Sequence, residues 1–546
     1  MRGGELLVHG VTVAEDAPAA IEPQAQRRSL GLVIGLAVAA VVAVALALAI
    51  TSDSPGFFPD STVYLGTARN LLDGRGLTTP FNLTFNPYSP ARAVAFHGEF
   101  PLTHYPPLYP VVLAVFAWFG GGLIGVARVL NAVLFGVNVV LAGVLVWRIT
   151  RSTAVALVSA FGFVITVNVV VNHGLVMSEP LMMAFVLGGA LLTPRMLRRP
   201  TTASVAAVSA CAAAAALTRI GGVGFVVAVA VAALLWMARP LRQRVRSSVL
   251  LAELGLAPLV LWLVMTRVVF GASDRPLVLH FPRSVFYDTF FDTVTGWLFG
   301  AGGDRTLHVV VLVAGVLAAV GLGVVVARDR LPPGATAAAV RERDDSNHLL
   351  GVLALFAGSY VVILLVSAAL FDAATASEGR VLLPVQMATA VVVIGLVYRV
   401  ASRVGGRAVA VTAVVMVVIF CAWPWRSIAQ GFGRVSTVDL LDRPAFSAPT
   451  RSPLAAAVRR LPRDAVVAST FPSTLWLGSG HDVIFIPPRR YQIAGDTNDD
   501  FREQLVELGR ILTQRRGYVA LFTDQPPEFV TTDELVRLVK LVELYR

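Results

Sequence analysis

Cysteine and lysine are almost missing from this sequence. Two cysteines occur in 546 residues, Cys211 and Cys421, and both lie within apolar stretches. This argues against a disulfide framework and against a metal site built from thiolates. Lysine occurs once, at Lys540, so the net charge of +11 comes almost entirely from arginine. In a soluble protein such a charge would favour nucleic acid or an anionic surface as the partner.

Charged residues are also scarce, whereas hydrophobic residues are abundant. Only 14% of the residues are charged and 56% are hydrophobic. Apolar runs of about 17–25 residues, the length that an α-helix needs to cross the hydrocarbon of a bilayer, recur along most of the chain before residue 425. The core of a soluble protein could not bury so many. The sequence therefore predicts a polytopic membrane protein whose partner is the lipid bilayer and not nucleic acid.

The arginines indicate how the chain crosses the membrane, because cytoplasmic loops of membrane proteins are enriched in Arg and Lys. Turns rich in arginine alternate with turns rich in acidic residues and histidine. The basic turns contain Arg27 and Arg28; Arg148 and Arg151; Arg195, Arg198 and Arg199; Arg239 through Arg246; Arg328 through Arg343; and Arg399 through Arg407. Counting the spans between them predicts about eleven transmembrane helices in the cytoplasmic (inner) membrane, with the amino terminus inside and the carboxyl terminus outside.

These turns divide the chain into three parts. Residues 1–28 are expected to form a cytoplasmic tail, residues 29–425 a transmembrane domain, and residues 426–546 an extracytoplasmic domain. The first outer loop, 52–122, is long. Its apolar stretch 108–119 is too short to cross the bilayer and follows two prolines, so we expect a re-entrant or interfacial helix there.

Beyond residue 425 the sequence has the character of a soluble domain. Short runs at 465–470, 483–486 and 518–522 predict strands. Apolar residues at spacings of three and four over 499–514 and 532–544 predict helices. The fold class predicted for the whole chain is therefore an all-α polytopic membrane protein with a small C-terminal extracytoplasmic α/β domain.

Asp60 stands out in the first outer loop, just after the first span. A carboxylate so close to the membrane is costly unless it faces water, a partner or a substrate. The apolar spacing that follows predicts an amphipathic helix along the membrane surface, with Tyr64 one turn after Asp60 and with Gly74 and Gly76 at its end. Two interpretations stay open for Asp60, a helix cap or a functional carboxylate.

The same loop contains further side chains that transfer protons or bind metals. Glu99 and His104 follow the predicted helix, and with Asp60 they are candidate ligands for a divalent cation. Their spacing is not that of a recognised metal motif, so the sequence predicts no certain cofactor.

A series of short motifs carries a resemblance to a known family. They are Asp60-Ser61-x-x-Tyr64, Asn70-Leu71-Leu72-x-Gly74-x-Gly76, Tyr105-Pro106-Pro107-Leu108-Tyr109-Pro110, Met177-Ser178-Glu179-Pro180-Leu181, Leu217-Thr218-Arg219-Ile220-Gly221-Gly222 and Glu378-Gly379-Arg380-Val381-Leu382-Leu383-Pro384. In order and sidedness they resemble the GT-C-type membrane glycosyltransferases of the protein O-mannosyltransferase and lipid A aminoarabinose transferase kind, related to glycosyltransferase family 39. The resemblance covers roughly residues 29–400.

The sequence departs from this family at two of the motifs. Asp60-Ser61 stands where these relatives commonly have Asp-Glu, and Arg380-Val381 stands where they often have Arg-Tyr. The first departure puts a second catalytic carboxylate in doubt, and both put the acceptor in doubt.

The resemblance implies a reaction and a set of roles. Its members transfer sugar from a polyprenyl-phosphate donor, so Asp60 would be the catalytic base, while cationic side chains would stabilise the departing phosphate. Arg219 and Arg380 are the first candidates for the phosphate, and Arg283 is a third. The remaining candidates for substrate binding are Tyr64, Glu99, His104 and Glu179. An ion pair for Arg380 and a helix cap for Glu179 are the competing interpretations.

The sequence thus favours a membrane hexosyl- or pentosyltransferase acting on the extracytoplasmic face. A mannosyltransferase and an arabinosyltransferase both fit, with a cell-envelope glycan, glycolipid or protein as acceptor. A transporter or lipid flippase is the main alternative, but the predicted helix centres lack the ionisable residues that coupled carriers place at the midplane. An inactive GT-C-like assembly subunit is a third possibility, against which the presence of Asp60 argues.

Overall fold

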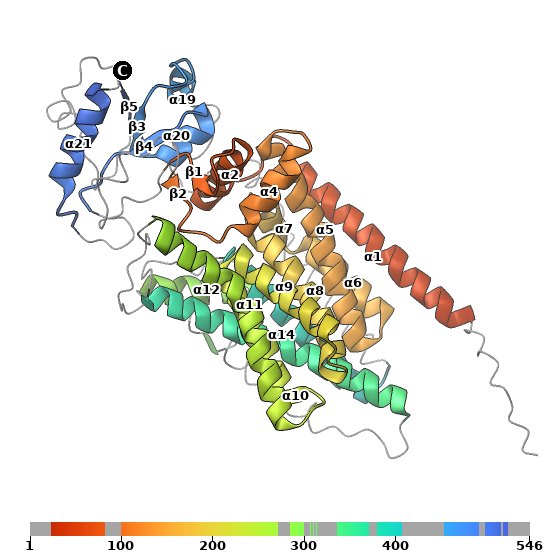
Figure 1. The fold of residues 1–546 in the computed structure, drawn as a ribbon. Helices are drawn as coiled ribbons and strands as arrows, with labels where there is room; N and C mark the ends of the chain where they lie inside the picture. The colour runs from red at the N-terminus through yellow and green to blue at the C-terminus, as the bar shows by residue number, and fades with distance from the viewer. Residues whose placement is uncertain are drawn as a thin grey trace, which may run out of the picture.

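The computed structural model describes residues 23–81, 100–270, 284–299, 336–370, 379–406, 452–490, 497–514 and 517–521, together with single residues between 306 and 321 (Figure 1). Most of these residues are helical, and the helices form one bundle that carries smaller elements at one end.

Long apolar helices make this a multi-pass membrane protein. Among the described residues, 6 helices are long and apolar enough to cross a bilayer. They are α1 (Pro23–Ile50), α5 (Leu123–Thr150), α8 (Glu179–Arg198), α11 (Leu241–Phe270), α14 (Ala337–Leu370) and α15 (Leu383–Val404). Helix α1 confirms the first expected span. The prediction of about eleven helices stays a prediction, because several of the expected spans fall partly or wholly on 300–335 and 407–451, mostly outside the described residues.

Two further pairs of apolar helices are separated by short breaks. Helices α6 (Thr153–Ile165) and α7 (Val167–Gly174) meet at a bend of 58°, where Thr166 takes an extended conformation. Helices α9 (Thr202–Thr218) and α10 (Val223–Trp236) are separated by the 3-10 turn η1 (Ile220–Gly222). A Cβ atom on Gly222 would overlap the carbonyl group of Ala215, so this close approach requires glycine. Both breaks place polar turns at helix ends.

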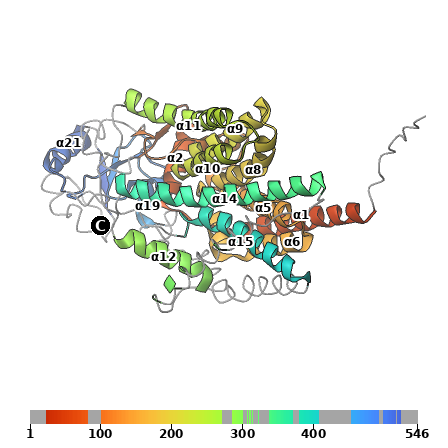
Figure 2. The same cartoon turned by 90° about the horizontal axis from the view of Figure 1, so that it is seen from below.

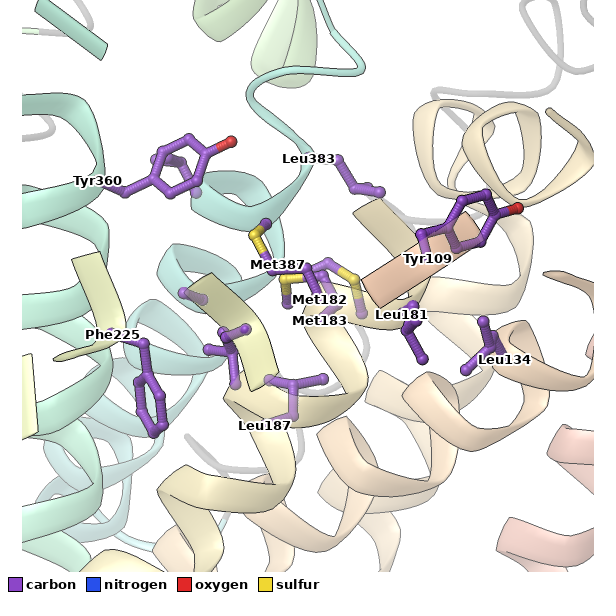
Figure 3. Packing of buried hydrophobic residues seen from close by; sticks show 14 of the residues in the cluster. Tyr109, Leu134, Leu181, Met182, Met183, Leu187, Phe225, Tyr360, Leu383 and Met387 are labelled. Carbon is purple, nitrogen blue, oxygen red and sulfur yellow. The ribbon is translucent and has the colours of Figure 1, made fainter. Parts of the chain in front are cut away.

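The centre of the bundle is packed with buried aliphatic side chains. Figure 3 shows Leu181, Met182 and Met183 of α8 converging with Leu383 and Met387 of α15. Helix α14 lies between α10 and α15 (Figure 2). Because lipid is as apolar as these side chains, such packing stabilises the bundle through close contact rather than through removal from water.

The two ends of the bundle carry different side chains. Helix α8 begins at Glu179 and ends at Arg198, so its acidic and basic residues lie at opposite ends. Arg198 pairs with Asp345 of α14, and Arg151, just after α5, pairs with Glu342 at 3.3 Å. The basic turns thus gather at one end, as expected for turns on one side of a membrane. We name this the basic end and the other, which carries Asp60, the acidic end.

Helix α2 (Pro59–Leu72) lies at the acidic end beside α4 (Leu108–Trp118). Both helices were expected, α2 followed by Gly74 and Gly76 in the left-handed conformation and α4 too short to cross a bilayer. The expectation that α2 lies along the membrane surface stays a prediction, but the helix is not exposed there on one whole face. It is buried on nearly all sides, because α4 covers one flank and α20 (Pro472–Ser479) packs against another.

The described residues after 451 form a parallel sheet flanked by helices. The strands are β3 (Val467–Ser469), β4 (Val483–Phe485) and β5 (Tyr518–Ala520), in the order β4-β3-β5, and each lies where a strand was expected. The helices are α19 (Pro453–Val458), α20 and α21 (Phe501–Gln514). The helix expected at 532–544 lies outside the described residues.

This C-terminal unit, residues 452–521, packs on the acidic end near α2 (Figure 1). Strand β1 (Thr78–Thr79), which pairs antiparallel with β2 (Phe100–Pro101), directly precedes the contact. The backbone N–H of Val483 donates to the carbonyl oxygen of Pro80 at 3.2 Å, and the ring of Phe81 lies 5.5 Å from that of Trp476. The C-terminal unit thereby holds the loop that carries Asp60.

Candidate active site

The first turn of α2 places the Asp60 side chain. Phe58 precedes the helix in an extended conformation and Pro59 begins it, which suits a residue with no N–H to offer. The hydroxyl of Ser61, rather than the Asp60 carboxylate, accepts the backbone N–H of Phe58 at 2.9 Å. Asp60 is therefore left to bond side chains, and the helix-cap interpretation does not account for its contacts.

The Asp60 carboxylate bonds groups from two distant segments. The Tyr105 hydroxyl donates to Oδ1 at 2.9 Å, and Nη1 of Arg380 donates to Oδ2 at 2.9 Å. Nη1 of Arg219 lies 3.9 Å from the same Oδ2. The Arg380 guanidinium also stacks on the ring of Phe58, at 4.2 Å from its centre. Two of the candidate phosphate ligands thus converge on the candidate base.

These neighbours set the charge state of Asp60. Its burial alone would raise the carboxyl pKa, since a buried carboxylate loses its hydration. The charges of Arg380 and Arg219, with the hydrogen bonds from Tyr105 and Arg380, outweigh burial and lower the pKa from 3.8 to about 2. Asp60 is therefore ionised at neutral pH.

Arg219 connects Asp60 to a second carboxylate. The extended Arg219 joins α9 to η1, and its Nη1 lies 3.1 Å from Oε1 of Glu179. The Glu179 side chain is 0% exposed, and within the described part of the chain neither of its oxygens has a hydrogen-bond donor. A buried carboxylate is expensive unless it is paired. Arg219 therefore lies between two carboxylates and is the charge partner of Glu179.

Buried amides on α5 hold the turn that precedes Glu179. Asn131 donates to the carbonyl oxygens of Leu175 and Met177, and Asn138 donates to that of Pro180. Both asparagines are almost fully buried. Amides inside an apolar helix are costly unless they bond, so they fix the start of α8 firmly.

Tyrosine rings pack together beside the Asp60 carboxylate. Tyr64 is fully buried, its hydroxyl lies 3.1 Å from that of Ser178, and its ring meets those of Tyr105 and Tyr109 edge to face. Burial raises the pKa of Tyr64 well above its usual range, so it stays neutral. Tyr64 thus packs against Tyr105, which bonds Asp60. At the edge of the site, the ring of His104 lies 4.6 Å from that of Tyr105.

Two of the candidate residues, Glu99 and Arg283, lie outside the described residues. Glu99 was also one of three candidate metal ligands. The other two do not make a cation site by themselves, because two guanidinium groups lie within 4 Å of Asp60 and would repel a divalent cation. Across the described residues there is no cluster of three or more His, Cys, Asp or Glu side chains placed to hold a metal.

The sequence interpretation missed Tyr105 and the two asparagines. Tyr105 belongs to the Tyr-Pro-Pro motif, but nothing in that motif shows that its hydroxyl reaches Asp60. Asn131 and Asn138 did carry a signal, since amides within an apolar span commonly bond neighbouring helices. The sequence does not show which groups these two asparagines bond.

The arrangement offers two kinds of chemistry in one place. An ionised carboxylate can accept a proton, and guanidinium groups can bind an anion such as phosphate through paired donors. The group lies at the ends of helices rather than at the centre of the bundle.

No protein-family model and no curated protein sequence matches this chain. Among solved structures it is similar to ArnT from Cupriavidus metallidurans bound to undecaprenyl phosphate, with 16% identity and a TM-score of 0.43, over 88% of this chain and 89% of that one. The apo state of that protein matches with 16% identity and a TM-score of 0.44, over 89% of each chain.

The chain is also similar to the archaeal oligosaccharyltransferase AglB from Archaeoglobus fulgidus in complex with an inhibitory peptide and a dolichol-phosphate. The identity is 13% and the TM-score 0.44, and the match covers 83% of this chain but only 64% of AglB. The similarity to these solved structures is distant. At these identities and TM-scores it carries no conclusion about the substrates of this chain.

Proposed function

We propose that this protein is a membrane glycosyltransferase that moves a sugar from a polyprenyl-phosphate carrier to a cell-envelope acceptor. The observation that supports this most is the convergence of Arg219 and Arg380 on Asp60, with Nη1 atoms 3.9 and 2.9 Å from Oδ2. A base beside two phosphate-binding groups is what such a transfer needs. The acceptor is a glycan, a glycolipid or a protein.

The proposed step is a single displacement. The acceptor hydroxyl gives its proton to Asp60, and its oxygen forms a bond to the anomeric carbon. The bond from that carbon to the phosphate oxygen breaks, and its electron pair leaves with the polyprenyl phosphate. Arg219 and Arg380 stabilise the charge that grows on the phosphate, because guanidinium groups match its oxygens with paired donors.

The other candidates take supporting roles in this proposal. Glu179 positions Arg219 through the ion pair between Oε1 and Nη1, which lie 3.1 Å apart. Tyr64 positions Tyr105 through contact between their rings. We assign His104 and Glu99, both in the first outer loop, to acceptor binding, and Arg283 to the phosphate as a further ligand. We assign the acidic end and the C-terminal unit to the outer face of the cytoplasmic membrane, with residues 1–28 inside and about eleven spans in all.

A transporter or lipid flippase is less well supported. Coupled carriers bind their cargo near the middle of the bilayer, where broken helices or charged side chains meet. Here the paired charges of Asp60, Arg219 and Arg380 lie at one end of the bundle. An inactive subunit would have no need of a carboxylate kept ionised beside two arginines.

Transfer of radiolabel tests the proposal. Purified protein is given polyprenyl-phosphate mannose or polyprenyl-phosphate arabinose with envelope fractions, and Asp60→Asn is the comparison. Transfer by the wild type that falls at least about 100-fold in the variant, while the variant still melts cooperatively well above the assay temperature, supports Asp60 as base and names the sugar. Equal transfer by both proteins would refute the role of Asp60.

The same assay tests the divalent cation. Because two guanidinium groups already lie against Asp60, we expect transfer to survive EDTA. Loss of transfer on chelation, restored by added Mg²⁺ or Mn²⁺, would show that Glu99 or other residues outside the described ranges complete a metal site.

A further inference from the structure

The contacts of Asp60 conflict with its proposed role. Both carboxylate oxygens are engaged, Oδ1 by the Tyr105 hydroxyl and Oδ2 by Arg380, and Arg219 adds a second positive charge. A carboxylate with a pKa of about 2 is a poor acceptor for the proton of an acceptor hydroxyl. The protein as described here is therefore in a state that suppresses the base.

We infer that Arg380 is shared between Asp60 and the donor phosphate, so that Asp60 becomes a competent base only once the donor has bound. This inference rests on the proposed function. Without donor, Arg380 neutralises Asp60. When the phosphate arrives, the guanidinium turns to it, and Oδ2 is released toward the acceptor hydroxyl.

The two arginines are placed differently for such an exchange. Arg219 has the fully buried Glu179 at 3.1 Å, and leaving it would strand a carboxylate without its charge partner. Arg380 lies just before α15, stacked on Phe58. Its side chain is about as exposed as that of Arg219, at 19% against 17%, so the buried partner Glu179 is what distinguishes the two. We therefore assign the exchange to Arg380 and a fixed position to Arg219.

A phosphate is a strong competitor for Arg380. Guanidinium binds phosphate with paired, charge-assisted hydrogen bonds, whereas Asp60 receives a single bond from Nη1. Once Arg380 has moved, Asp60 loses its largest favourable charge interaction, so its carboxylate accepts a proton more readily, while Arg219 stays near. Tyr105 keeps its bond to Oδ1 and holds the carboxylate in position.

Binding measurements on the full-length protein in detergent test the exchange. The ligand is undecaprenyl phosphate, followed by microscale thermophoresis, with undecaprenol and inorganic phosphate as separate arms to divide the lipid contribution from that of the phosphate. Since Asp60 competes for Arg380, we expect Asp60→Asn to bind undecaprenyl phosphate about tenfold more tightly than the wild type. Undecaprenol should bind both proteins equally.

Two controls separate sharing from simple repulsion. Asp73→Asn removes an exposed carboxylate of the same helix region, where Asp73 lies 3.6 Å from Arg69, and should leave the affinity unchanged. Arg380→Gln should bind more weakly, and adding Asp60→Asn to it should give no gain, because the shared group is gone. A gain that persists without Arg380 would mean that Asp60 merely repels the phosphate, and would overturn the inference.

The outcomes distinguish this inference from the proposed function. If the wild type binds undecaprenyl phosphate and transfers sugar, but Asp60→Asn has the same affinity, only the sharing is wrong. If the wild type neither binds the lipid phosphate nor transfers sugar, the proposed function fails and the inference fails with it.

Discussion

The two ends of the helical bundle both pair arginine with carboxylates, but in different surroundings. At the acidic end, the side chains of Asp60 and Glu179 are 10% and 0% exposed. At the basic end, Glu342 is 56% exposed beside Arg151, whereas Asp345 beside Arg198 is 11% exposed. Both carboxylates of the acidic end are thus buried, whereas the basic end combines one exposed pair with one buried pair.

The difference distinguishes charges that follow from how the chain crosses the membrane from charges that serve a reaction. Exposed pairs at the basic end need no explanation beyond the bias of arginine toward turns on one side of a membrane, and such pairs contribute little to stability. Buried pairs cost desolvation that their attraction often fails to offset. The cluster around Asp60 and Glu179 is therefore hard to explain by stability, and function is the better account of it.

The largest effect is expected at Glu179. Replacing it by Gln leaves Arg219 without its closest charge partner in a buried position, and breaking such pairs costs about 3–5 kcal/mol. We expect a marked fall in the melting temperature, followed by tryptophan fluorescence, together with loss of sugar transfer. A melt equal to that of the wild type would show that the acidic end is not the more costly of the two.

The second largest effect is expected from acid, which should remove the stability that ionised Asp60 contributes at the acidic end. The pKa of Asp60 is lowered from 3.8 to about 2, so its contribution is fully present above about pH 4 and is lost as the pH falls toward 2. A shift of this size corresponds to about 2 kcal/mol. Melts at pH 6, 4 and 3 should therefore converge for wild type and Asp60→Asn as the pH falls. Curves that stay parallel would mean that Asp60 is not ion-paired.

A smaller effect is expected from Tyr105→Phe, which removes one hydrogen bond to Oδ1 and keeps the ring. Loss of a hydrogen bond to a charged group costs about 1.5–3 kcal/mol at most, and less where water can enter. We expect a several-fold loss of transfer and a fall in the melting temperature smaller than that of Glu179→Gln. Transfer equal to that of the wild type would remove Tyr105 from the site.

The smallest effect is expected at the basic end. Glu342→Gln breaks an exposed pair with Arg151, so the free energy of unfolding should change by no more than about 1 kcal/mol, and sugar transfer should not change. This variant is the matched control for Glu179→Gln. A loss of transfer here would remove the distinction between the two ends.

Local patterns in the sequence predicted local structure well. Run length identified α1 as a span and α4 as too short to be one, and apolar spacing identified α2 and the strands of the C-terminal unit. These features depend on residues close together in the chain. The burial of α2 could not be predicted, because α20 covers it from the far end of the sequence.

The candidate site was predicted in its members but not in its contacts. Asp60, Glu179, Arg219 and Arg380 were all chosen from motifs, and the structure brings them together. That Arg219 would pair with Glu179, or that Tyr105 would bond Asp60, depends on how helices pack, which no single motif encodes. Glu99 and Arg283 lie outside the described residues and stay predictions.

The contact between the C-terminal unit and the first outer loop has a consequence for biosynthesis. Asp60 is made early, but Arg380 follows 320 residues later, and the Gly480 carbonyl that accepts a bond from Arg69 follows its partner by 411. Contacts so distant in sequence form late, after the intervening segments are ordered. A ribosome must therefore finish most of the chain before the site exists, and prematurely terminated products would insert into the membrane without acquiring activity.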